Sequence, residues 1–358
     1  MRVLVAMSGG VDSSVTAKLL QDGGYECIGC IMRLYDNEDV GISKSNTCCS
    51  LDDVEDARSV AYRLNMPFYV FNFTSDFKEK IINKFVSSYK SGITPNPCID
   101  CNRYMKFDRL YNRAKVLDCD YIATGHYARI EKEDGKYVLK KALDETKDQS
   151  YVLYAMTQEQ LAHTLFPLGG LQKSETRTIA EQSGFINAKK PDSQDICFVP
   201  NGKYADIVEL HSGKKSEPGE FKNINGEVLG QHRGIIHYTI GQRKGLGLAL
   251  PSPHYVCGIN SDTNTVILGS EKDLYSDTFT VENFNWISGE TPSEPIYCKV
   301  KIRYRQKEQP AKVFPLQGGR VEVVFDQPQR AITPGQAAVL YDGDVVLGGG
   351  TVAKNRDL

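Results

Sequence analysis

Hydrophobic positions in roughly the first 200 residues follow two alternating patterns. Short apolar runs rich in β-branched and aromatic residues lie at 3–7, 26–32, 68–73 and 121–125, and each is typical of a buried strand. Between them, apolar residues recur at helical spacing, as at 52–64 and 77–90. Strands that alternate with helices predict an α/β fold, a parallel sheet with helices on both faces. The ligand site of such a sheet is expected at the carboxyl ends of its strands.

A different pattern begins at about residue 203. Apolar residues there form short alternating runs punctuated by Gly and Pro, with no long helical period. The runs lie at 234–240, 265–268, 296–305, 320–325, 337–341 and 345–351. They predict an all-β part made of small barrels. We therefore expect an α/β domain at 1–202, a small central linker domain at 203–272 and a C-terminal all-β barrel at 273–358.

Composition limits the classes of function. The chain has 358 residues, is 41% hydrophobic and carries a formal net charge of −2. This charge excludes a globally basic nucleic-acid binder, so a polyanionic partner would need a local basic surface. With a strand pattern at its start and no apolar stretch long enough to span a bilayer, the chain is expected to be cytoplasmic, without a membrane partner. Its ten cysteines are then expected to be thiols, metal ligands or catalytic groups rather than a disulfide framework.

The first strand is followed by Ser8-Gly9-Gly10-Val11-Asp12-Ser13. A strand that breaks at two glycines and restarts as a helix points backbone N–H groups and a positive dipole end at one spot, where phosphate binds. No Gly-Lys-[Ser/Thr] follows, and the third glycine of the dinucleotide fingerprint is absent. The pattern S-G-G-x-D-S resembles the pyrophosphate loop of ATP pyrophosphatases, which adenylate a carbonyl oxygen and release pyrophosphate. A Gly-Gly turn without a catalytic role is the alternative.

The cysteines divide into structural and chemical candidates. Five lie in or beside apolar runs, where cysteine is usually a small buried hydrophobe: Cys27, Cys30, Cys119, Cys257 and Cys298. Cys48 and Cys49 are adjacent in a polar loop. They would be either exposed thiols or part of a nucleotide lid.

Cys98 and Cys101 form a C-x-x-C motif that is expected in a proline-stiffened loop before a helix at 105–117. The helix terminus, Arg103 and Lys106 would favour thiolate there. The motif alone leaves zinc, iron–sulfur and redox chemistry open, although the absence of a second C-x-x-C argues against a four-cysteine zinc site. Cys197 is the remaining candidate, at the end of the same α/β domain.

Seven motifs in one order resemble the bacterial tRNA-specific 2-thiouridylases. They are S-G-G-V-D-S (8–13), T-P-N-P-C-x-x-C-N (94–102), A-T-G-H-Y (123–127), K-D-Q-S-Y (147–151), D-S-x-x-I-C-F (192–198), G-Q-R-K-G-L-G (241–247) and T-P-G-Q (333–336). The resemblance covers essentially the whole chain. It implies an N-terminal pyrophosphatase-loop catalytic domain, a small central domain and a C-terminal tRNA-binding barrel.

The resemblance implies an ATP-dependent enzyme that replaces the 2-oxygen of the wobble uridine (position 34) of tRNA with sulfur, releasing AMP and pyrophosphate. Its cofactors would be ATP and Mg²⁺, with Asp12 helping to hold the metal. The residues that would bind ATP are Ala6, Met7, Ser8, Gly9, Gly10, Val11, Asp12, Ser13, Met32 and Gly125.

The family scheme also implies the route of sulfur. Cys197 would receive a persulfide from a donor protein and deliver its outer sulfur to the activated carbon. Cys101 would release that sulfur by attacking the persulfide, closing a Cys101–Cys197 disulfide that is later reduced. Asn96, Pro97 and Cys98 would surround the target base, flipped out of its stack.

Further residues match family positions that touch tRNA: His126, Lys147, Asp148, Gln149, Arg303, Tyr304 and Gln336. For His126, the alternative is a satisfied core imidazole. Every odd residue at 299–307 is basic, and strand geometry would place all five on one face, as an electrostatic track for RNA phosphate. A solvated strand face is the alternative.

Cys98 departs from the commoner family pattern, in which Asp takes a base-like role toward the nucleophilic cysteine. With Cys98, Cys101 and Cys197 the site has three thiols, which is compatible with a 4Fe-4S cluster as in related tRNA thiolation enzymes. The sequence leaves the persulfide and iron–sulfur routes open. Two further alternatives are another adenylating pyrophosphatase, such as an amidotransferase-linked ligase, and a non-catalytic RNA-binding protein with a metal clip.

Overall fold

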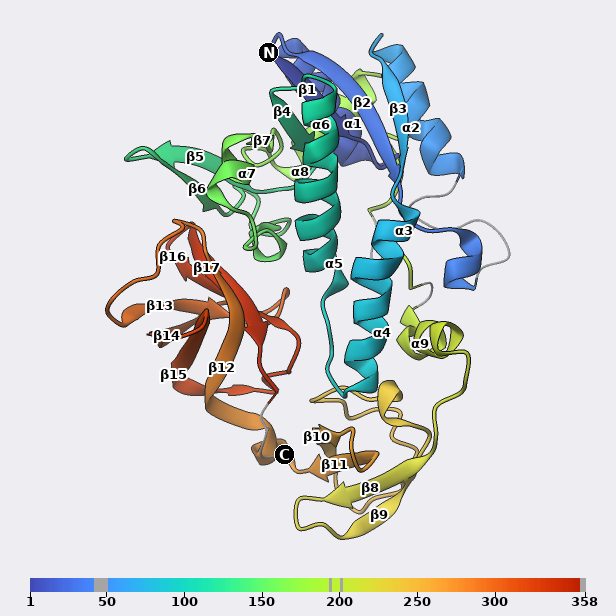
Figure 1. The fold of residues 1–358 in the computed structure, drawn as a ribbon, viewed down its shortest axis with the longest axis vertical. Helices are drawn as coiled ribbons and strands as arrows, with labels where there is room; N and C mark the ends of the chain where they lie inside the picture. The colour runs from blue at the N-terminus through green and yellow to red at the C-terminus, as the bar shows by residue number, and fades with distance from the viewer. Residues whose placement is uncertain (42–50, 193–194, 200–201, 355–358) are drawn as a thin grey trace.

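The computed structural model describes residues 1–41, 51–192, 195–199 and 202–354 (Figure 1). Cys48 and Cys49 lie outside the described residues. The chain forms an upper α/β part, a barrel beside it and a smaller β-sheet below them (Figure 1). Among the described residues, no helix combines the length and apolar character that crossing a bilayer requires.

A five-stranded parallel sheet forms the core of the first domain, in the order β3-β2-β1-β4-β7. Its strands are β1 (Arg2–Ala6), β2 (Glu26–Arg33), β3 (Phe68–Asn72), β4 (Tyr121–Thr124) and β7 (Thr164–Leu165). The strand order reverses at β1, because β2 and β4 flank it on opposite sides. This reversal is the switch point at which ligands bind in open α/β sheets.

Successive residues of β1 point to opposite faces, and each face is covered by helices. Val3 and Val5 pack with apolar residues of α1 (Val11–Asp22), α2 (Leu51–Arg63) and α8 (Lys173–Gln182). Leu4 packs into the other cluster, with Phe85 and Leu110. The predicted parallel sheet with helices on both faces is therefore confirmed.

Two long helical stretches cover the Leu4 face. The first comprises α3 (Thr74–Phe77), the π-helical segment η2 (Lys78–Ile82) and α4 (Asn83–Lys90). The second comprises α5 (Pro97–Asp100), the π-helical segment η3 (Cys101–Leu110) and α6 (Tyr111–Val116). The expected start of this helix at 105 is wrong, because Asn96 is the N-cap and Pro97, whose fixed φ suits a first turn, begins the helix. Cys98 and Cys101 therefore lie in a helix and not in a loop.

The central part contains one helix that the sequence pattern did not reveal, α9 (Tyr204–Ser212), which buries Ile207 and Val208. A strand was expected at 234–240, but Ile235–His237 forms a 3₁₀ turn, η6, after Gly234 at φ +115°. The described strands pair in the order β10-β11-β8-β9. They are β8 (Gly219–Asn223), β9 (Val228–His232), β10 (Tyr255–Asn260) and β11 (Thr265–Gly269).

The C-terminal strands form a closed antiparallel barrel, as predicted. They are β12 (Tyr275–Trp286), β13 (Ile296–Lys301), β14 (Gln309–Leu316), β15 (Arg320–Arg330), β16 (Ala337–Asp342) and β17 (Val345–Val352). Pairing of β12 with both β15 and β17 closes the ring. The hairpin β5 (Arg129–Glu133) and β6 (Lys136–Lys140) extends the barrel sheet through the pair Val345–Lys140. The first domain thus contributes strands to the sheet of the last one.

Candidate active site

The phosphate loop lies between β1 and α1. Gly9 has φ +73°, a conformation that favours glycine, and a Cβ there would lie 2.5 Å from the backbone oxygen of Asp53. Gly10 is the N-cap of α1, and no side-chain hydrogen bond caps this helix. The amides of its first turn are therefore available to an anion, which the helix dipole also favours.

Gly125 follows β4 and faces the same turn. A Cβ at this position would lie 2.9 Å from the Asp12 carbonyl carbon and 2.9 Å from the Ser13 nitrogen. The neighbouring strands β1 and β4 therefore bring Gly125 directly against the start of α1. Of the other predicted nucleotide residues, Met7 is buried and Met32 is half-buried near the end of β2.

Basic side chains surround the loop, and sequence reasoning missed them. The Lys173 Nζ lies 2.6 and 2.8 Å from the two carboxylate oxygens of Asp12. The Lys190 Nζ lies 3.3 Å from the Gly9 carbonyl oxygen and pairs with Asp53 and Asp56. Arg177 follows Lys173 by four positions on α8, and this helical spacing is the sequence signal that could have identified the pair.

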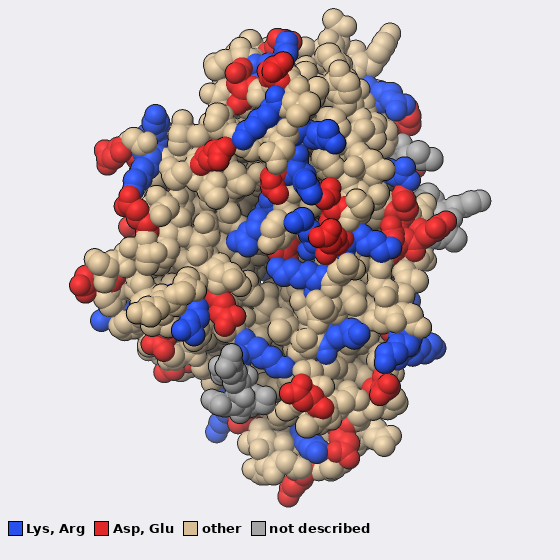
Figure 2. Space-filling view, in the orientation of Figure 1, with Lys and Arg blue, Asp and Glu red and all other residues tan. Residues whose placement is uncertain are grey.

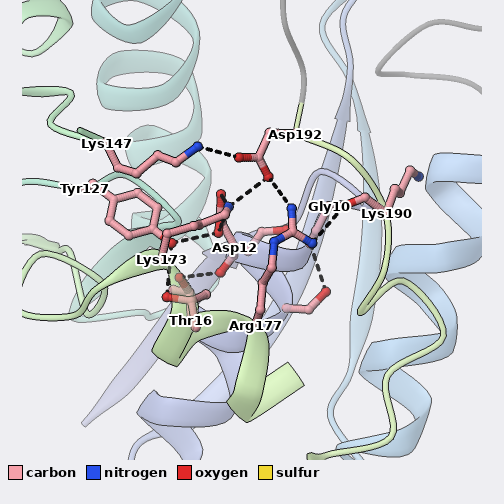
Figure 3. Close-up of polar contacts among 12 residues, drawn as sticks. Gly10, Asp12, Thr16, Tyr127, Lys147, Lys173, Arg177, Lys190 and Asp192 are labelled. Carbon is pink, nitrogen blue, oxygen red and sulfur yellow. Dashed lines mark hydrogen bonds and ion pairs between the residues drawn. The ribbon is translucent and has the colours of Figure 1, made fainter. Parts of the chain in front are cut away.

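The Asp192 carboxylate and the Asn187 side-chain amide hold these basic side chains and the loop in place. Asp192 accepts from Lys147, Lys173 and Arg177 (Figure 3). Burial acts to raise the pKa of Asp192, but hydrogen bonds from Lys147 and Lys173 outweigh it and leave the pKa below its usual value. The buried Asn187 amide donates to the Gly9 oxygen and to Ser14 Oγ, each at 2.9 Å. Both ends of the loop are therefore held before any ligand binds.

Cys98 and Cys101 lie near the start of one helix in different surroundings. Cys98 is exposed, whereas Cys101 is half-buried and is a thiol. Burial raises the pKa of Cys101, and Lys106 opposes this only in part. The predicted preference for thiolate is therefore wrong for Cys101, because this residue is a full turn inside the helix and desolvation disfavours its charge.

Cys197 approaches this region from the end of the same domain. The Tyr35 hydroxyl donates to the Cys197 carbonyl oxygen at 2.6 Å. The next residue, Phe198, packs edge-on against Phe77 and Phe85 at ring-centroid distances of 5.6 and 5.2 Å. Cys101 and Cys197 both pack against the apolar cluster that contains these rings. No group of three or more His, Cys, Asp or Glu side chains is gathered closely enough to hold a metal ion in the described part of the chain.

Comparison with known proteins agrees with this geometry. Family models described as "tRNA methyl transferase HUP domain", "tRNA methyl transferase PRC-barrel domain" and "Aminomethyltransferase beta-barrel domain" match residues 1–201, 206–270 and 276–352. A "tRNA-specific 2-thiouridylase MnmA" of Clostridioides difficile is 49% identical over 99% of this chain and 98% of its own length. That of Acetivibrio thermocellus is 50% identical over 98% and 99%. The chain belongs to the tRNA-specific 2-thiouridylase family.

A more distant likeness is to a solved structure. An NMN synthetase from Francisella tularensis covers 60% of this chain and 78% of its own, with 17% identity and a TM-score of 0.35, too low to carry an argument.

Several positions at which the thiouridylase family pattern implied tRNA contact have their side chains turned into this protein. His126 is buried, with Nδ1 2.6 Å from Thr124 Oγ1, and burial lowers its pKa well below the usual value. This placement agrees with the alternative of a satisfied core imidazole. Lys147 pairs with Asp192, and the Asp148 carboxylate accepts from the backbone of Ala142.

Of the remaining positions, Gln149 bonds within the catalytic domain of the thiouridylase fold, whereas Tyr304 and Gln336 join the barrel to it. Gln149 exchanges hydrogen bonds with the backbone of Tyr127. The Tyr304 hydroxyl donates to the Asp148 carbonyl oxygen at 3.1 Å. The Gln336 amide donates to the Thr94 oxygen at 2.9 Å, close to the helix that carries Cys98. These side chains therefore build the junction that positions the site.

The predicted five-residue basic face is wrong. Strand β13 ends at Lys301, and residues 303–306 form a turn that is not part of the strand. The Arg303 guanidinium donates to the Ala331 oxygen at 2.9 Å and to Thr333 Oγ1 at 3.0 Å. Lys301 lies over the rings of Tyr151 and Tyr304. Three of the five cations are exposed: Lys299, Arg305 and Lys307.

Proposed function

We propose that this protein is an ATP-dependent tRNA 2-thiouridylase that acts on the wobble uridine. The observation that carries the proposal is the identity of about 50% over nearly the full length with relatives of that name. The phosphate loop at the switch point and the thiols at 98, 101 and 197 supply the two chemistries that such a reaction needs.

ATP is needed because the 2-oxygen of uracil is a poor leaving group. Attack of this oxygen on the α-phosphorus of ATP releases pyrophosphate and makes the oxygen part of an AMP leaving group. The amides at the start of α1 and the ammonium of Lys173 would hold the phosphates. Asp12 fits a role in holding Mg²⁺, since this ion is usually bound by one or two carboxylates together with substrate phosphates.

Sulfur would arrive as a persulfide on Cys197, formed by transfer from a persulfide-bearing donor protein. Its terminal sulfur attacks C2 of the adenylated base. Cys101, as thiolate, then attacks the Cys197 sulfur, so the S–S bond breaks, a Cys101–Cys197 disulfide forms and the sulfur left on C2 expels AMP. An external dithiol reduces this disulfide by supplying the two electrons, and is itself oxidised to a disulfide. Cys101 must lose its proton for this step, and Cys98, one helical turn earlier, is the group we assign to accept it, in its thiolate form.

We prefer this route to one through an iron–sulfur cluster. The three cysteines do not form a metal-binding group among the described residues, so the side chains as placed do not fit a cluster. The target base would enter beside Asn96, Pro97 and the exposed Cys98.

The tRNA would meet local basic surface despite the net charge of −2. Lys and Arg side chains gather in the middle of the face shown in Figure 2, around the hollow between the barrel and the α/β part. The exposed cations Lys299, Arg305 and Lys307 add charge on the barrel. The enzyme would act in the cytoplasm, where tRNA and a persulfide donor are both present.

ATP–pyrophosphate exchange, measured with and without tRNA, tests the proposal. We expect exchange that requires tRNA, and 2-thiouridine when a persulfide donor is added. Cys101→Ser and Cys197→Ser should each abolish 2-thiouridine but keep exchange, whereas Asp12→Ala should lose exchange. Exchange without tRNA would indicate another adenylating ligase, and no exchange would indicate a non-catalytic RNA-binding protein.

A further inference from the structure

Three cations share the carboxylate of Asp192. The Lys147 Nζ lies 2.8 Å from Oδ2, while the Lys173 Nζ and an Arg177 Nη lie 2.9 and 3.0 Å from Oδ1 (Figure 3). These side chains come from different parts of the chain and converge on one acceptor. The carboxylate thus sits at the focus of positive charge beside the phosphate loop.

One of these cations, Lys173, lies at the position where ATP phosphates are proposed to bind, while Arg177 also donates to the backbone oxygens of Ala188 and Lys190. Lys173 also holds Asp12, which lies in the first turn of α1. The Lys173 side chain is only 11% exposed, so its ammonium has little room for a partner in addition to the two carboxylates. A phosphate that reaches this ammonium must therefore compete with one of them.

The balance of charge favours replacement of the Asp192 carboxylate by a phosphate as the partner of these cations. The positive charges of Lys147, Lys173 and Arg177 face two negative charges, those of Asp12 and Asp192. A triphosphate carries more negative charge than a carboxylate and offers the guanidinium of Arg177 a two-point acceptor. Asp12 remains available to Lys173 or to Mg²⁺ after the exchange.

Asp192 also lies five positions before Cys197. Downstream of Cys197, Phe198 is anchored by apolar packing in the core. Upstream, the ionic cluster at Asp192 is the charged anchor, in addition to the Tyr204 hydroxyl on Asp195 and the Tyr35 hydroxyl on the Cys197 carbonyl oxygen. An arriving phosphate weakens only the ionic anchor, because apolar packing does not respond to charge.

We propose that Asp192 is a built-in competitor of the ATP triphosphate. It occupies Lys173 and Arg177 until ATP binds, and the transfer of these cations to the phosphates releases the charged upstream anchor of Cys197. ATP binding and the freedom of Cys197 are then coupled, and the coupling acts equally in both directions. This inference rests on the proposed use of ATP at the phosphate loop, but not on tRNA or sulfur chemistry.

Binding of α,β-methylene ATP with Mg²⁺, measured by calorimetry without tRNA, tests the competition. The methylene bridge blocks cleavage, so binding is observed alone. Asp192→Asn removes the competing charge and leaves Lys173 paired with Asp12, so we expect at least about fivefold tighter binding. Asp22→Asn is the control, because Asp22 pairs only with Lys18 on the exposed side of the far end of α1. Unchanged or weaker binding in Asp192→Asn would overturn the proposal, since Asp192 would then be neutral toward ATP or assist it.

Alkylation of Cys197 by iodoacetamide, followed by mass spectrometry, tests the coupling in the wild-type protein. The analogue should accelerate alkylation at least threefold, and Asp192→Asn should react at the accelerated rate without it. If bound analogue does not change the rate of Cys197 alkylation in the wild-type protein, the coupling is overturned. This outcome does not depend on whether the variant folds. If both effects are observed but the protein does not thiolate tRNA, only the proposed function is contradicted.

Discussion

The side-chain amide of Gln336, in the last domain, donates to the backbone oxygen of Thr94 at 2.9 Å, across 242 positions of sequence. The Thr94 nitrogen in turn donates to the Pro334 oxygen at 3.0 Å. Gly335 permits this approach, since a Cβ there would lie 2.9 Å from the Thr94 oxygen. The T-P-G-Q motif of the barrel therefore holds the segment that leads into the helix with Cys98 and Cys101.

Gln336→Ala should slow thiolation about fivefold and leave ATP-analogue binding unchanged. The reason is that a buried backbone acceptor loses its donor, at a cost of about 1 kcal/mol, and the start of the catalytic helix is displaced. Single-turnover formation of 2-thiouridine measures the effect. Gln309→Ala is the control, because the Gln309 amide reaches only the neighbouring Lys307 oxygen. Equal rates for both variants would contradict this role of the junction.

The variants Arg303→Ala and Arg305→Ala should differ in their effects on stability and on tRNA binding. Arg303 is half-buried and holds the oxygens of Ala331 and Thr333, so its loss should destabilise the protein by about 2 kcal/mol. Arg305 is exposed, so its loss should leave the melting temperature unchanged and lower the salt slope of tRNA binding by about one unit. Thermal melts and filter binding at several salt concentrations distinguish the two. The reverse assignment of effects would restore Arg303 as a simple phosphate contact.

Gly125→Ala should weaken ATP binding by at least tenfold. Its new Cβ would meet backbone atoms of Asp12 and Ser13 at 2.9 Å, so the first turn of α1 must move away from the position that binds phosphate. Gly170→Ala is the matched control, because nothing lies within 4 Å of a Cβ there. Calorimetry with the ATP analogue compares them, and wild-type affinity in Gly125→Ala would remove Gly125 from the nucleotide site.

Lys106→Met should shift the pH profile of sulfur release to higher pH. Burial raises the pKa of Cys101 and Lys106 lowers it, so loss of the cation raises the pKa further. The thiolate is the reacting form, so the rate should rise with pH in both proteins. The variant should be slower at neutral pH and approach the wild type as pH rises through the Cys101 pKa. Lys106→Arg keeps the charge and should retain the wild-type profile. A variant profile without displacement would exclude Cys101 ionisation as the controlling step.

Local pattern was sufficient for much of this protein. The continuous apolar run at 3–7 predicted a buried strand, and the Ser8-Gly9-Gly10 break predicted the turn from this strand into a helix. The prediction from local pattern failed at Cys98 and Cys101, because a proline such as Pro97 is equally typical of a loop and of the first residue of a helix. It failed again at Arg303, where alternating charge resembles a strand although β13 has already ended.

The sequence by itself determined the fold class, the glycine turn after the first strand and the family, because strand and helix periods, turn glycines and ordered motifs are local properties of the chain. Only the tertiary structure decided what the polar side chains do. Lys173 and Arg177 lie beside the glycine turn, on Asp12 and Asp192, because α8 packs beside α1. Tyr304 and Gln336 became junction residues because the barrel docks onto the catalytic domain. Whether a charged or polar group meets solvent, RNA or another residue depends on how distant segments pack, as Lys173 and Asp12 do across 161 positions of sequence, and no local pattern contains such partners.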